Sequence, residues 1–198
     1  YKVTGFRRVL FRSLKNRDRV LYWNVYTKMT GKDAFLRLNT TDASTASPNL
    51  WGTSNPTSLV FGGAGTDLSN GYAAGEKIIA YCWAEIEGFS KFGSYVGNGS
   101  ADGPFVYCGF KPAWILVKRI DSADHWAIFD SVRDSSNNND NLILYPNLTN
   151  GDSGDATGYD KLSNGFKVRS TATRYNASGG SYIFAAFAES PFVTANSK

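Results

Sequence analysis

Two glutamates near the middle of the chain have the spacing of a catalytic pair. Glu85 and Glu87 lie in the segment AEIEGF, at the end of an apolar run that is typical of a β-strand. Residues two apart on a strand point to the same face, about 7 Å from each other. That separation suits the two carboxylates of a glycosidase, so these residues are the catalytic candidates of the chain.

A comparison within the chain favours a non-enzymatic interpretation. Glu85 recurs as Glu189 in a second, similar segment, where Pro191 replaces Glu87. The single histidine, His125, is expected to be a half-buried or surface residue rather than a general base. The chain has no GxSxG, HExxH, phosphate-binding or dinucleotide-binding motif. We therefore expect a protein that is not an enzyme, with a glycoside hydrolase as the alternative.

The candidates for ligand binding lie in polar loops. Trp51 stands in SPNLWGTSNPTS, without a counterpart in the similar segment. An exposed tryptophan stacks well on a sugar ring, but a ring that packs against its own domain is the favoured interpretation. Two loops rich in Asn, Asp and Gly supply the other candidate ligand-binding residues, Asn137, Asn139, Asp152 and Tyr159.

The same two loops also contain the only candidate metal ligands. Asp140, Asp152 and Asp155 offer carboxylates of the kind that hold Ca²⁺. Their spacing fits no defined calcium loop, so we favour solvated turns and expect no cofactor. Cys82 and Cys108 lie in apolar runs, which favours buried thiols over a disulfide.

An internal repeat determines the expected architecture. The segment KNRDRVLYWNVY (residues 15–26) returns as KRIDSADHWAIF (residues 118–129), and GEKIIAYCWAE (75–85) returns as GGSYIFAAFAE (179–189). This is a tandem duplication, and a residue kept in both copies is expected to serve the fold.

Short apolar runs separated by Asn- and Gly-rich turns indicate strands and no helix of useful length. In the second half of the chain these runs are FVYCGF, WILVKR, HWAIFDS, NLILYP, GFKVRS and SYIFAAFAE. The sequence therefore predicts an all-β protein of two tandem antiparallel β-sandwich repeats with jelly-roll or lectin-like topology.

The first thirteen residues match nothing else in the chain. RRVLFRS (residues 7–13) resembles the translation of a short-read library adapter, and a genuine basic entry strand is the alternative. We expect residues 1–13 to be a non-native segment, residues 14–91 a first repeat truncated at its N-terminus, residues 92–193 a second repeat and residues 194–198 a tail.

The charge of the chain depends on this segment. Lys2, Arg7, Arg8 and Arg12 lie in it, and removing these four from the 21 basic residues leaves 17, equal to the 17 acidic residues. A neutral chain with scattered charges lacks the basic surface that nucleic-acid binding requires. No apolar stretch is long enough for a membrane helix, so membrane insertion is not expected.

Three further segments carry a resemblance to a known family: residues 85–119 (EIEGFSKFGSYVGNGSADGPFVYCGFKPAWILVKR), residues 162–169 (LSNGFKVR) and residues 176–192 (NASGGSYIFAAFAESPF). Together they resemble an uncharacterised family of tandem repeats that is abundant in marine phages and environmental metagenomes. The resemblance extends from residue 14 to about residue 192 and offers no catalytic residues to carry over.

The resemblance implies concanavalin A-like sandwich units, often within phage tail-fibre-like proteins. It makes a structural and adhesion module of a virion the leading hypothesis, with cell-surface glycan and other virion or fibre subunits as partners. The location would be the virion surface or the extracellular space. A glycan-cleaving tail enzyme that uses Glu85 and Glu87 and a bacterial extracellular adhesin are the alternatives.

Overall fold

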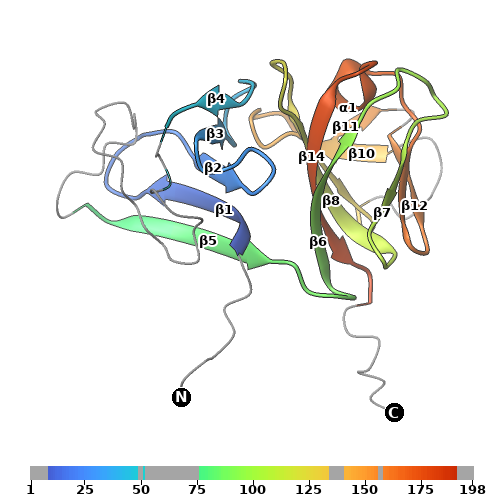
Figure 1. Ribbon diagram of the computed structural model, residues 1–198, viewed down its shortest axis with the longest axis horizontal. Helices are drawn as coiled ribbons and strands as arrows, with labels where there is room; N and C mark the ends of the chain where they lie inside the picture. Colours follow the sequence, from blue (N-terminus) through green and yellow to red (C-terminus); the bar gives the residue numbers. More distant parts are fainter. Residues whose placement is uncertain (1–8, 49–50, 52–75, 134–140, 156–157, 191–198) are drawn as a thin grey trace, which may run out of the picture. The chain divides into compact units, whose positions relative to one another are not determined.

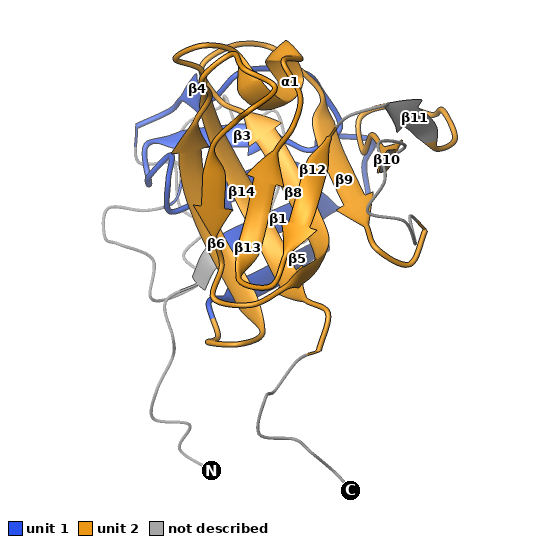
Figure 2. Cartoon of the chain, turned by 90° about the vertical axis from the view of Figure 1, so that its right-hand side faces the viewer, with its two compact units in different colours: residues 1–85 blue, residues 86–198 orange. Residues whose placement is uncertain are grey.

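The computed structural model describes residues 9–48, 51, 76–133, 141–155 and 158–190. Every pair of neighbouring strands in it is antiparallel. The only described helix is a single turn, α1 (Thr173–Asn176). The prediction of an antiparallel all-β protein is therefore confirmed. The chain divides into two compact units, residues 1–85 and 86–198 (Figures 1 and 2).

Unit 1, residues 1–85, contains a five-stranded sheet with the order β4-β3-β2-β1-β5. Its strands are β1 (Val9–Asn16), β2 (Asn24–Thr27), β3 (Ala34–Arg37), β4 (Thr45–Ala46) and β5 (Ile78–Ala84). A small apolar cluster of Leu14, Tyr26, Phe35 and Trp51 packs on this sheet. The described residues of this unit form no second sheet, so a two-layered first repeat stays a prediction.

Unit 2, residues 86–198, contains a six-stranded sheet, β11-β10-β9-β8-β14-β6, and a three-stranded sheet, β12-β13-β7. Their strands are β6 (Ser90–Val96), β7 (Phe105–Tyr107), β8 (Pro112–Arg119), β9 (Trp126–Asp130), β10 (Asn141–Leu144), β11 (Ser153–Asp155), β12 (Tyr159–Leu162), β13 (Gly165–Val168) and β14 (Ser181–Ala188). Figure 2 shows the two sheets of this unit as separate layers.

The two sheets of unit 2 enclose one apolar core. Alternate residues of each strand point inward, as pleating requires, so Ile115 and Val117 of β8 and Phe166 and Val168 of β13 are all at most 1% exposed. Burial of each such side chain stabilises the folded state by about 1.5–3 kcal/mol. The core therefore fixes the three-stranded sheet against the six-stranded sheet and makes a rigid support for surface residues.

The five strands of unit 1 have the same order as five strands of unit 2. β1 lies between β2 and β5, and β8 lies between β9 and β14. The register of the strand pairs is also the same. Phe11 pairs with Thr27 in β1–β2, and the residues about 103 positions later in the chain, Trp114 and Asp130, pair in β8–β9. The β1–β5 and β8–β14 pairings each contain one register shift. It lies between Val9 and Phe11 in β1 and at the corresponding residues, Pro112 and Trp114, in β8. The sequence repeat thus corresponds to one repeated sheet.

Polar residues that occur in both copies hold matching turns. Lys15 donates a hydrogen bond to the carbonyl of Leu21 at 2.8 Å, and Lys118 donates to the carbonyl of Asp124 at 2.9 Å. The carboxylate of Asp121 accepts from the backbone amide of Ser181, just as the carboxylate of Asp18 accepts from the amide of residue 77. These residues serve the fold and leave no need for a functional explanation.

Two expectations about unit 1 need correction or qualification. Residues 9–13 lie in β1, although the sequence-based interpretation left residues 1–13 out of the fold. Residues 1–8 lie outside the described residues.

Cys82 is exposed, so it is not the buried thiol that was expected, whereas Cys108 is buried. Neither cysteine forms a disulfide. None of the described helices has the length and hydropathy of a membrane-crossing segment.

Candidate functional site

Glu85 and Glu87 do not share one face of a strand. β5 ends at Ala84, and Glu85 follows it directly. Glu87 lies in the turn that Ile86 and Ser90 close through their backbone pairing. Because the strand ends before either glutamate, the strand geometry that suggested a catalytic pair is absent.

Trp51 is a core residue of unit 1. It is 3% exposed, and its indole N–H donates to the carbonyl of Ala34 at 2.8 Å. Its ring meets that of Tyr26 edge to face at 5.5 Å. A ring that is covered in this way cannot stack on a sugar, so Trp51 is not the exposed platform that its loop position suggested.

Most of the remaining candidate residues are buried, paired or outside the described residues. Tyr159 is 2% exposed, and its hydroxyl hydrogen-bonds that of Tyr95 at 2.9 Å, so it belongs to the core of unit 2. Asp152 forms an ion pair with Arg133 at 2.5 Å. Asp155 lies in β11, and Asn137, Asn139 and Asp140 lie outside the described residues.

The other expected centres of chemistry have structural partners. The ring of His125 hydrogen-bonds the side-chain amide of Asn147 at 2.8 Å and lies 5.3 Å from the ring of Tyr145. Within the part of the chain that the structure describes, no three His, Cys, Asp or Glu side chains come together as a metal site.

Two aromatic side chains are exposed on the outer face of the three-stranded sheet. Phe105 and Tyr107 of β7 are 46% and 63% exposed, whereas Val106 between them is 6% exposed and lies in the core. Because strand residues alternate between faces, both aromatic rings project from the same outer face. Adjacent exposed aromatic residues are a feature of interaction surfaces, so we take this face as the candidate site.

Gly165 allows the Phe105 ring to lie close to the backbone of β13. It lies opposite Tyr107 in the β7–β13 pairing. A Cβ at this position would come within 2.1 Å of the carbonyl oxygen of Val106 and 3.1 Å of ring atom Cζ of Phe105. Only glycine fits there, and the Phe105 ring therefore reaches across this part of the sheet.

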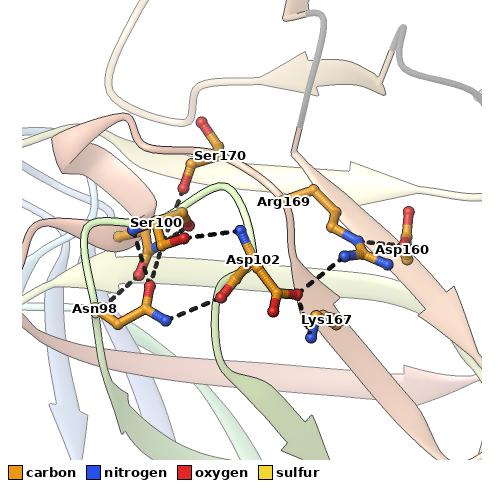
Figure 3. Close-up of polar contacts among 8 residues, drawn as sticks. Asn98, Ser100, Asp102, Asp160, Lys167, Arg169 and Ser170 are labelled. Carbon is orange, nitrogen blue, oxygen red and sulfur yellow. Dashed lines mark hydrogen bonds and ion pairs between the residues drawn. The ribbon is translucent and has the colours of Figure 1, made fainter.

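Four charged residues border the aromatic pair. Lys167 lies opposite Phe105 in the register, and its ammonium group contacts the carboxylate of Asp102 at 2.7 Å. Arg169 contacts the same carboxylate at 3.3 Å and that of Asp160 at 2.6 Å (Figure 3). Two cations and two carboxylates leave this border without net charge, so it does not select for a charged ligand.

Asp102 is the most accessible member of this charged group. Its side chain is 77% exposed. The pKa of Asp102 is lowered, chiefly by the hydrogen bond from Lys167 and also by the positive charges of Lys167 and Arg169. The carboxylate is thus ionised at neutral pH and can accept further hydrogen bonds from a ligand that approaches from solvent.

A hydrogen-bonded loop holds Asp102 in place. The side-chain amide of Asn176, which is fully buried, donates to Asn98 at 3.0 Å and to the carbonyl of Ser100 at 2.6 Å. Asn98 in turn donates to the carbonyl of Asp102 at 3.0 Å (Figure 3). Because these bonds are made within the unit, the loop is ordered before any ligand binds, which lowers the entropic cost of binding.

Sequence reasoning missed this face for an identifiable reason. FVYCGF is a continuous apolar run, which is typical of a strand buried on both sides. On the outside of a two-layered unit, the same run buries alternate residues (Val106, Cys108 and Phe110) and exposes those between them. The sequence feature that could have indicated this exposed face is the segment KVR (residues 167–169) at the end of β13. Its charged residues, Lys167 and Arg169, alternate with the buried Val168.

Comparison with known protein families gives a match over most of the chain. The model of a family described as "Domain of unknown function (DUF7483)" matches residues 10–191. No curated protein and no solved structure matches the chain.

Proposed function

The chain belongs to the family described as Domain of unknown function (DUF7483), and we propose that it is a structural and adhesion module of a phage tail-fibre-like virion protein. In this proposal the module contacts carbohydrate on the host surface. It acts at the virion surface or in the extracellular space, with glycan and other virion or fibre subunits as partners.

The exposed pair of Phe105 and Tyr107 is the observation that carries the proposal. Aromatic rings pack on the apolar faces of sugar rings, while neighbouring polar groups hydrogen-bond the hydroxyls. Asp102 and Arg169 supply such groups at the edge of the pair. A rigid sheet holds all of them, and the balanced charge suits a neutral saccharide.

The proposal is for binding without cleavage and without a cofactor. A glycosidase needs two carboxylates that flank one bond at about 5–9.5 Å. Glu85 and Glu87 lie beyond the end of β5 and in the following turn. Asp102 and Asp160 are each paired with a cation, and the pKa of Asp102 is lowered by its hydrogen bond from Lys167, so Asp102 is not held as a protonated acid.

The finer architecture is part of the same proposal. The repeated sheet order supports two tandem sandwiches of concanavalin A-like or jelly-roll type, one in each unit. A bacterial extracellular adhesin built from the same repeat would show the same surface. The two settings differ in their gene neighbourhoods, where virion components would favour the phage protein.

A glycan array tests the binding. We expect the full chain to bind neutral saccharides and Phe105→Ala or Tyr107→Ala to weaken that binding by at least about tenfold, as loss of a central contact does. Tyr22→Ala, which removes an exposed tyrosine of unit 1, is the matched control and should bind normally.

Each other outcome contradicts a defined part of the proposal. Normal binding by both variants would contradict the assignment of this face. Release of sugar products that is lost in Glu87→Gln would make the protein an enzyme. Absence of binding to any glycan would leave a structural role and would contradict adhesion to carbohydrate.

A further inference from the structure

We propose that the outer face of β7 binds a linear neutral saccharide of at least two sugar residues, with one residue on the ring of Phe105 and the next on the ring of Tyr107. The inference rests on the proposed binding of carbohydrate and goes beyond it, because it specifies the length of the ligand and which of its residues is recognised by hydrogen bonds. It starts from the spacing of the two exposed rings on β7.

The two rings are separate contact sites. Phe105 and Tyr107 lie on either side of Val106, which is buried in the core. Residues two apart on a strand are about 7 Å from each other along its axis, which exceeds the width of one pyranose ring. A single sugar residue therefore cannot stack on both side chains, whereas two linked residues can.

The rings also extend in different directions. A Cβ on Gly165 would lie 3.1 Å from Cζ of Phe105, so the Phe105 ring extends sideways toward the neighbouring strand β13. A Cβ on Gly109 would lie 3.5 Å from the hydroxyl oxygen of Tyr107, so the Tyr107 ring extends along the chain, beyond the end of β7. Because the rings diverge, neither covers the other, and both stay accessible to a ligand.

The two ends of this face differ in charge. Lys167 lies opposite Phe105 and contacts the carboxylate of Asp102, so ionised groups border the Phe105 ring. The exposed turn of residues 163–164 lies beside Tyr107, since its backbone accepts hydrogen bonds from the two residues that follow Tyr107. This turn, Ser-Asn, carries no charge.

The difference in charge assigns a role to each end. Hydrogen bonds to ionised groups are stronger than those between neutral groups, so Asp102 can select the hydroxyl pattern of the sugar residue that stacks on Phe105. An aromatic ring packs on an apolar sugar face without reading the hydroxyls in this way. The sugar residue on Phe105 is therefore the selective one, and the residue on Tyr107 adds affinity.

Both ends of the face are held in place before a ligand binds. At one end, the buried Asn176 holds the loop that carries Asp102. At the other end, the carbonyl of Asn164 accepts hydrogen bonds from the amides of Cys108 and Gly109 at 2.9 and 3.1 Å. A sugar residue that is linked to a bound one reaches the second ring without a second loss of translational freedom. A disaccharide should therefore bind more tightly than its monosaccharide.

A series of sugars of increasing length tests the inference. The probes are glucose, mannose and galactose with their β-1,4-linked disaccharides and tetrasaccharides, titrated calorimetrically into the full chain. In a series that binds, we expect the disaccharide to bind at least about tenfold more tightly than the monosaccharide. Tyr107→Ala should bring the two affinities together, whereas Tyr107→Phe, which keeps the ring, should retain the difference. Tyr22→Ala is the matched control and should also retain it.

The outcomes distinguish this inference from the proposed function. A monosaccharide that binds as tightly as its disaccharide would overturn the inference and leave carbohydrate binding intact. A difference that persists in Tyr107→Ala, or that is lost in Tyr107→Phe, would overturn the assignment of the second contact to the Tyr107 ring. If no series binds while glycans on the array do, the inference fails alone. If neither binds, the proposed adhesion to carbohydrate fails with it.

Discussion

Replacement of Arg12 with isoleucine is expected to stabilise unit 1. The Arg12 side chain is 1% exposed, and its Nε and Nη2 atoms have no hydrogen-bond partner within the described structure. Burial lowers the pKa of Arg12 because the guanidinium loses its hydration. The equivalent residue in unit 2, Ile115, is fully buried in the core, so the fold accepts an apolar side chain at this position.

The expected gain is the balance of four contributions. Each unpaired buried donor costs about 1–3 kcal/mol, and burial of an isoleucine side chain contributes about 1.5–3 kcal/mol. The guanidinium lies 4.3 Å from the ring centre of Tyr26 and 5.2 Å from that of Trp51. Loss of these two cation–π contacts costs about 0.5–2 kcal/mol each, and the smaller side chain leaves a cavity that costs about 1–2 kcal/mol. The net stabilisation is roughly 2 kcal/mol.

Urea unfolding followed by amide hydrogen exchange measures this change, because the amides of β1 and β5 report on unit 1 alone. The matched variant Ile115→Arg places an unpaired cation in the core of unit 2 and should lower the stability of that unit by about 3–5 kcal/mol. An unchanged or lower stability of unit 1 in Arg12→Ile would refute the reasoning. The cation–π contacts would then outweigh the cost of the unpaired donors.

Three further predictions concern unit 2. Gly93→Ala should destabilise it by about 1–3 kcal/mol in urea unfolding, because the new methyl group overlaps the Phe184 ring, whereas Gly151→Ala, which has open space around it, should have no such effect. Asn176→Ala should lower the melting temperature, because the carbonyl of Ser170 accepts a buried hydrogen bond from the Asn176 amide at 2.9 Å and would lose its donor, a cost of about 1–3 kcal/mol; an unchanged melting temperature would show that water replaces the amide. By NMR the pKa of the Asp102 carboxylate should lie below that of an ordinary aspartate because Lys167 donates a hydrogen bond to it, and Lys167→Met should raise that pKa. Since the folded pKa is the lower one, any stability from this pair is present above the unfolded pKa and is lost as the pH falls through the folded pKa.

The sequence predicted the strands that have a strong apolar pattern. The segments WILVKR, HWAIFDS and SYIFAAFAE correspond to β8, β9 and β14, which form the centre of the larger sheet. β6 was not predicted, because SKFGSYV interrupts its apolar residues with Gly93 and two serines. The glycine is there because the Phe184 ring lies against it, and this requirement comes from the neighbouring strand. A pattern within one segment cannot reveal it.

The candidate site was harder to predict than the strands. The polar neighbours of Trp51 left a sugar platform open beside the favoured packed ring, and its side chain fills the small cluster on the unit 1 sheet. Phe105 and Tyr107 looked buried because their segment is apolar, yet they lie on the outside of the thinner sheet. In both cases the burial of an aromatic ring depends on which element covers the strand, and that is a property of the tertiary structure.

Differences between the two units separate scaffold from function. The sheet β4-β3-β2-β1-β5 repeats in unit 2, and the residues conserved in both copies hold its turns. The candidate glycan face is built on β7, β12 and β13, which have no counterpart among the described strands of unit 1. Since only the shared sheet recurs among the described strands of unit 1, we expect one saccharide to bind each chain.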